Sequence, residues 1–155
     1  MEALANFVSF LKKSKLLSEN FNIKKNLSSR FYVQKYVYLA KHFGLDLGYN
    51  YNLYVKGPYS SDLALDYYSD NFQTTVDVKN IFPGFRQEEY LKLVSGKTEH
   101  WLELGTTLIF FNVRNPGKSL EDYVEFTKLA KPWASESTIM VIATELRGLG
   151  LLEVV

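Results

Sequence analysis

The fold is decided by residues 29–43, whose sequence is SRFYVQKYVYLAKHF. Apolar and aromatic residues recur through this segment at helical spacing, and only a narrow polar stripe interrupts them. We therefore expect a central helix that packs against neighbours on several sides. Gly44 follows at a position where glycine commonly ends a helix. The polar stripe consists of Arg30, Gln34, Tyr38 and Lys41.

The residues after this helix change period. Residues 49–55 alternate apolar and polar side chains, which predicts a strand, and Gly57-Pro58 ends it because proline lacks a backbone donor. Ser60 or Ser61 then caps a helix that runs to about residue 70. A second short strand is predicted over residues 73–80.

The rest of the chain is typical of helices. One helix precedes the central segment, over 3–15, and four more follow residue 70, over 86–95, 98–112, 119–129 and 135–146. Residues 151–155 are expected to form a short strand. The fold class predicted for residues 1–155 is a single α+β domain, mainly α: a compact bundle of about six helices with one or two short strands. A winged-helix arrangement is an alternative.

The composition and the absence of known motifs argue against several classes of functional site. The chain has no Cys, and His42 and His100 stand 58 positions apart, so we expect no metal site and no cofactor. Asp62, Asp66 and Asp70 share one helix face, and a solvated face explains them better than a Mg²⁺ or Ca²⁺ site. No Walker A loop, GxGxxG or GxSxG is present, so we expect no enzyme.

The longest apolar runs are far shorter than the roughly 20 residues of a membrane helix. The N-terminus carries Glu2 where a secretory signal would carry a basic residue. We therefore expect no membrane association and a cytoplasmic location.

Charge is unevenly distributed along the chain. Residues 1–41 hold eight Lys or Arg against two acids, a net charge of +6, although the whole chain carries +1. A nucleic-acid-binding regulator that uses this basic segment is therefore one functional hypothesis. Its candidate contacts are Lys12, Lys13, Lys24, Lys25, Arg30, Gln34, Lys35 and Lys41.

Two motifs carry a family resemblance. VQKYVYL at residues 33–39 is followed by YVKGPYS at residues 54–60. This order resembles the YwgA-like group of uncharacterised bacterial and archaeal proteins and, more distantly, the Panacea domain of SocA-type antitoxins, where a Trp stands at the position of Tyr54. The resemblance implies a protein-binding module that neutralises toxins or acts as an adaptor for proteolysis.

The leading functional hypothesis is a non-enzymatic binding or regulatory protein. Tyrosine is concentrated around a rigid Gly-Pro turn, and tyrosine is enriched where proteins make their strongest contacts. The expected partner is another protein, and self-association is left open. The candidate contact residues are Tyr51, Tyr54, Lys56, Gly57, Pro58, Tyr59 and Ser60.

Overall fold

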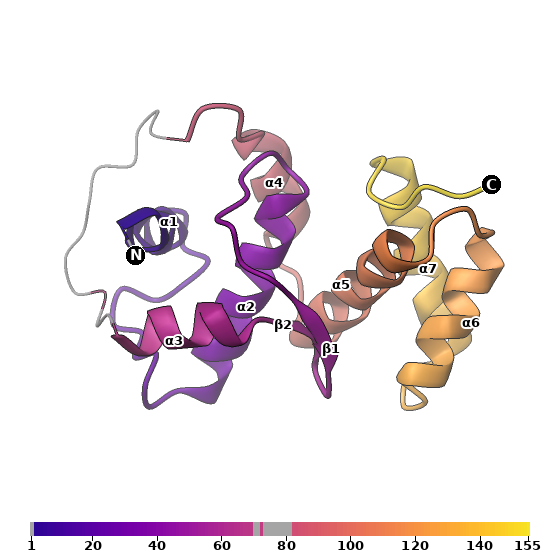
Figure 1. The fold of residues 1–155 in the computed structure, drawn as a ribbon, viewed down its shortest axis with the longest axis horizontal. Helices are drawn as coiled ribbons and strands as arrows, with labels where there is room; N and C mark the ends of the chain where they lie inside the picture. Colours follow the sequence, from indigo (N-terminus) through magenta and orange to yellow (C-terminus); the bar gives the residue numbers. More distant parts are fainter. Residues whose placement is uncertain (1, 70–71, 73–81) are drawn as a thin grey trace. The chain divides into compact units, whose positions relative to one another are not determined.

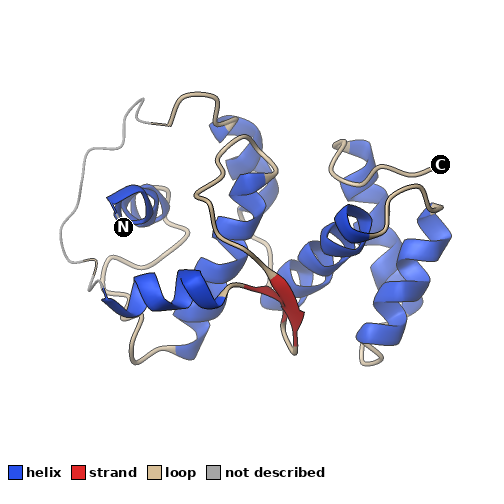
Figure 2. Cartoon of the chain, in the orientation of Figure 1, coloured by secondary structure: helices blue, strands red, loops and turns tan. Residues whose placement is uncertain are grey.

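The computed structural model describes residues 2–69, 72 and 82–155, so the strand predicted over 73–80 lies outside the described residues. Figures 1 and 2 show that the described part is built from helices and one small sheet, a β-hairpin. The predicted α+β, mainly α fold class is thus confirmed. The elements are α1 (Glu2–Lys13), α2 (Leu27–Lys41), β1 (Asn52–Tyr54), β2 (Gly57–Tyr59), α3 (Ser61–Ser69), α4 (Gln87–Val94), α5 (Glu99–Arg114), α6 (Leu120–Ala130) and α7 (Glu136–Gly148).

The chain packs as two compact units. Unit 1 comprises Met1–Asn52 and Tyr59–Lys97, and unit 2 comprises Leu53–Pro58 and Thr98–Val155. Most of the hairpin therefore packs with the C-terminal helices, although it lies between α2 and α3 in the sequence. The expectation of a single domain stays a prediction.

Aromatic side chains form much of the core of unit 1. Phe7 and Phe10 of α1 lie with their ring centroids 6.1 and 6.3 Å from that of Tyr90 in α4. The Tyr90 hydroxyl donates a 2.9 Å hydrogen bond to the carbonyl of Tyr36 in α2. Burial raises the Tyr90 pKa well above its usual value, so the hydroxyl remains a donor. This bond ties α4 to α2 inside the core.

The central helix lies two residues earlier than the sequence indicates, at 27–41 instead of 29–43. The Asn26 side chain accepts a hydrogen bond from the Ser29 backbone, and this cap sets the start of the helix. Gly44 follows the helix with φ +93°, as a terminating glycine should. A Cβ on Gly44 would collide with the Gly84 carbonyl, so the site also requires glycine for close backbone approach.

Unit 2 is built on α5, α6 and α7. Ser119 and Asp122 form a reciprocal capping box at α6, and Ser135 caps α7. The strand predicted over 151–155 is wrong, because this segment is irregular and no strand of the described residues pairs with it. Its backbone is instead held by Asn112 and by the Lys118 carbonyl.

None of the described helices is both long and apolar enough to cross a membrane.

Candidate functional site

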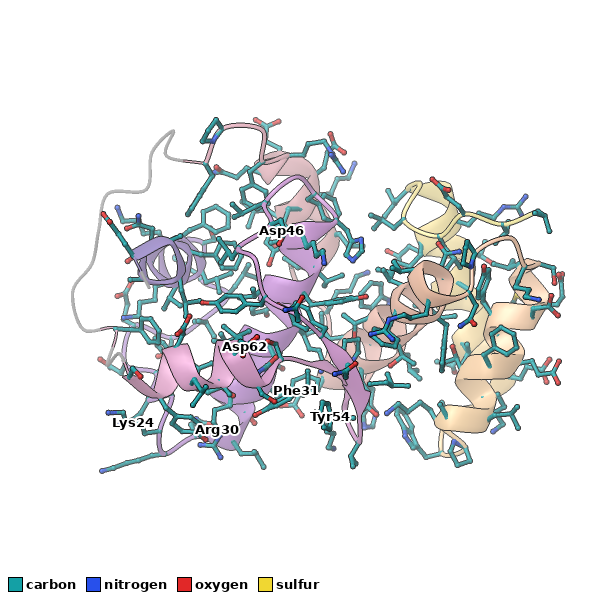
Figure 3. All side chains as sticks on the ribbon, in the orientation of Figure 1. Lys24, Arg30, Phe31, Asp46, Tyr54 and Asp62 are labelled. Atoms are coloured by element: carbon teal, nitrogen blue, oxygen red, sulfur yellow. The ribbon has the colours of Figure 1, made fainter. Side chains whose placement is uncertain are left out.

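The hairpin brings its turn to the surface. Val55 and Lys56 alone connect β1 to β2, and Gly57 follows with φ +101°. Tyr54 and Val55 are 50% and 86% exposed, and Lys56 is also exposed. Figure 3 shows Tyr54 on this hairpin. We call residues 54–56 the hairpin tip.

A buried ion pair holds the backbone of the hairpin tip. The Lys131 ammonium, directly after α6, donates a 2.6 Å hydrogen bond to the Val55 carbonyl. The same nitrogen lies 3.0 Å from Oε2 of Glu103 on α5, and the two side chains are only 4% and 5% exposed. The sequence offered no signal for this pair, because the two residues are 28 positions apart and neither belongs to a motif.

Gly57 lets the hairpin lie directly on α5. A Cβ at this position would stand 3.1 Å from the Thr107 hydroxyl oxygen, closer than ordinary packing allows. The Thr107 hydroxyl is fixed in this position, because it donates a 2.6 Å hydrogen bond to the Glu103 carbonyl. The hairpin therefore rests on a surface that has no space for a larger residue.

Most of the predicted contact residues lie away from the surface. Tyr51, Gly57, Pro58 and Ser60 are buried, and Tyr59 is half-buried. These seven candidates therefore do not form one exposed surface, and their role as contact residues stays a prediction. Tyr54 and Lys56 remain exposed, and Val55, which sequence reasoning missed, is the most exposed residue of the hairpin tip.

The first motif of the resemblance contacts the last residue of the second motif, Ser60, inside unit 1, and this contact serves the fold. The Gln34 amide accepts a hydrogen bond from the Ser60 backbone N–H and donates one to the Ser60 carbonyl, both at 2.9 Å. The Ser60 hydroxyl accepts from the Leu63 backbone and so caps α3. The Tyr67 hydroxyl also forms a hydrogen bond with the Gln34 side chain. Burial raises the pKa of Tyr67 to about 12. Gln34 is thus a buried positioning residue and is not available to contact bases.

Two lysines of the proposed nucleic-acid set are also buried. Lys12 donates to the Phe72 carbonyl, and its ammonium lies 5.0 Å from the centroid of the Phe21 ring. Lys35 is buried with its ammonium 5.0 Å from the centroid of the Phe31 ring. These two lysines therefore lie inside the protein, away from the surface that a nucleic acid would contact.

The other basic candidates are accessible to different degrees. Arg30 is half-buried and donates to the carbonyls of Ile23 and Lys24, near the start of α2 (Figure 3). Four lysines of the set are exposed, namely Lys13, Lys24, Lys25 and Lys41. The nucleic-acid hypothesis stays a prediction that now depends on these four.

The acidic face of α3 makes a side-chain contact within unit 1. The Tyr49 hydroxyl donates a 2.6 Å hydrogen bond to Asp66, and burial, followed by this bond, raises the Tyr49 pKa. Asp62 is exposed, and Asp70 lies outside the described residues. Across residues 2–69, 72 and 82–155, no group of three or more His, Cys, Asp or Glu could hold a metal ion.

His42 is half-buried and neutral. Burial, and then the neighbouring Lys41 charge, lowers the His42 pKa to about 4. Its Nε2 has no hydrogen-bond partner within the part of the chain that the structure describes. The ring packs on Tyr38, with the ring centroids 5.1 Å apart, so its contact in the fold is apolar.

Comparison of the chain with protein-family models, curated proteins and solved structures finds no match. The resemblance to YwgA-like proteins and the Panacea domain therefore stays a prediction.

Proposed function

We propose that this chain is a non-enzymatic protein-binding module whose principal contact is the hairpin tip. The observation that carries the proposal is an exposed Tyr54–Val55 pair on a turn whose backbone is held by the buried Lys131–Glu103 pair. An exposed aromatic beside an exposed aliphatic residue is the kind of anchor that dominates protein interfaces.

The anchoring of the turn favours binding. Lys131 fixes the Val55 carbonyl, and Gly57 lies on α5, so the backbone of the hairpin tip is ordered before a partner arrives. Ordering a loop on binding costs free energy, and a preordered loop avoids that cost. Roles as a toxin-neutralising protein or a proteolytic adaptor, which the resemblance implies, are finer forms of this proposal.

The proposal is tested by a pull-down in which the captured protein is identified and its affinity for the full chain is then measured. The double variant Tyr54→Ala/Val55→Ser should weaken binding by about 30-fold, since loss of an interface anchor costs about 2 kcal/mol. Its melting temperature should be almost unchanged, because both side chains lie at the surface.

The control variant is Leu65→Ser, which removes an exposed aliphatic side chain from α3 in unit 1. It should bind with the affinity of the natural chain. Equal affinity of the hairpin-tip variant, or equal losses in both variants, would contradict the proposed function.

A further inference from the structure

The surface around the hairpin tip includes aromatic rings from two other segments of unit 2. Trp133, two residues after Lys131, is 50% exposed, and its ring centroid lies 4.7 Å from that of the exposed His100. His100 is in the first turn of α5, one turn before Glu103. Because Lys131 contacts both Glu103 and Val55, the hairpin tip, the start of α5 and the α6–α7 connection are neighbours.

The connection that carries Trp133 is itself fixed. The Lys128 ammonium donates hydrogen bonds of 2.9 and 2.6 Å to the carbonyls of Pro132 and Ala134, on either side of Trp133. Ala134 is buried, and Ser135 caps α7 immediately afterwards. Trp133 is thus held outward by a short ordered segment, as the hairpin tip is by Lys131.

Lys56 supplies an exposed positive charge on this surface. Lys56 is exposed, and no carboxylate among the described residues forms an ion pair with it. Glu103 is neutralised by Lys131, and Glu99 and Glu136 stand in the first turns of α5 and α7, where the helix dipoles offset their charge. The surface therefore combines aromatic and aliphatic groups with one available cation.

We propose that this tip–Trp133 surface, formed by Tyr54, Val55, Lys56, His100 and Trp133, binds a short peptide segment of the partner protein in which an apolar side chain stands next to a carboxylate. The inference rests on the proposed function and specifies the chemistry of the partner. The apolar side chain packs against Trp133 and the hairpin tip, and the carboxylate pairs with Lys56.

The size of the surface favours a peptide over a second copy of the chain. Fully covering an aromatic side chain buries about 150–250 Å², so two half-exposed aromatic residues and a valine offer on the order of 300 Å². A stable dimer of globular chains needs about 800 Å² from each partner. The exposed area suits a few residues of an extended segment.

The experiment is a selection of random short peptides displayed on phage against the full-length chain, followed by fluorescence titration of the enriched peptides. In the Trp101→Phe variant, Trp133 is the only tryptophan, since the chain has two. Peptide binding should shift its emission to shorter wavelength, because the ring loses water. The enriched peptides should carry Asp or Glu beside an apolar residue.

Two variants test the assigned contacts through the fluorescence anisotropy of a dye-labelled enriched peptide, because Trp133→Ala lacks the reporting ring, and circular dichroism verifies that each one folds. Trp133→Ala should weaken peptide binding by about tenfold or more, and Lys56→Glu should weaken it and shift the selection toward Lys- or Arg-containing peptides. Val141→Ser, an exposed position on α7 of unit 2, is the matched control and should bind normally. Absence of enrichment, absence of an acidic preference, or undiminished binding by Trp133→Ala would overturn the inference.

The outcome also separates this inference from the proposed function. If Tyr54→Ala/Val55→Ser weakens binding of the captured protein while Lys56→Glu and Trp133→Ala leave it unchanged, the proposed function stands and the peptide inference fails. If none of these variants weakens binding of the captured protein, both fail.

Discussion

Replacement of Lys131 by methionine should destabilise unit 2 far more than an ordinary surface substitution. Methionine retains a long unbranched side chain but removes the charge that faces Glu103 at 3.0 Å, where both side chains are almost fully buried. Glu103 would be left as a buried charge without compensation. Removing one partner of such a pair costs about 3–5 kcal/mol, a large fraction of the 5–15 kcal/mol that stabilises a typical domain.

The double variant Lys131→Met/Glu103→Leu should recover most of this loss. Two apolar side chains of similar volume can replace a buried ion pair at little net cost. The Val55 carbonyl would still lose its charged donor, so the double variant does not recover the contribution of that hydrogen bond. We expect the double variant to lie within about 1–2 kcal/mol of the natural chain.

The assay is urea unfolding followed by tryptophan fluorescence. Trp101 and Trp133 both belong to unit 2, so the signal reports unfolding of the unit that contains the ion pair. Lys118→Met, an exposed lysine of the same unit, is the control and should change the free energy of unfolding by less than about 0.5 kcal/mol. A loss below about 1 kcal/mol in Lys131→Met, or a double variant as unstable as the sum of the single ones, would refute the reasoning.

Three further predictions concern other buried polar groups. The unfolded chain protonates His42 near pH 6.5 and the folded chain only near pH 4, so the free energy of unfolding should fall by about 1.4 kcal/mol per unit as pH drops between these values. In His42→Phe this part of the pH dependence should vanish, whereas in His100→Gln it should persist, as urea unfolding at several pH values will establish. Gln34→Leu should lower the free energy of unfolding by about 1–3 kcal/mol, because the Ser60 N–H loses its hydrogen-bond acceptor inside the protein. The Ser60 carbonyl loses the Gln34 donor but keeps its hydrogen bond from the Ala64 N–H. A melting temperature equal to that of the natural chain would contradict this prediction. Thr127→Val should be neutral or stabilising by about 1 kcal/mol, because the buried Thr127 hydroxyl has no hydrogen-bond partner among the described residues. A clear decrease in melting temperature would show that the hydroxyl does have a hydrogen-bond partner.

The local elements were predictable because their signals are local. Ser119 and Asp122 form the capping box that their spacing indicates, and Ser60 caps α3 as expected. Periodicity located α2 to within two residues. The strand expected over 151–155 failed because strand formation needs a partner strand, and pairing is not encoded in a short segment by itself.

The candidate site was predictable only in part. The sequence directed attention to the Gly-Pro turn, and Tyr54 and Lys56 are indeed exposed there. It placed Gln34 and Tyr38 on a polar stripe, although the structure buries both residues. A polar side chain on a helix can face solvent or a buried backbone group, and the spacing of residues is the same in both cases.

By itself, the amino-acid sequence determined the helical character of the chain, the serine caps of α3, α6 and α7, and the turn at Gly57-Pro58. These features follow from interactions among residues close together in the chain. Only the tertiary structure decided that Gln34 binds the Ser60 backbone, that Lys131 binds both Glu103 and the Val55 carbonyl, and that Trp133 packs on His100. Each of these contacts joins residues at least 26 positions apart, and packing alone brings such residues together.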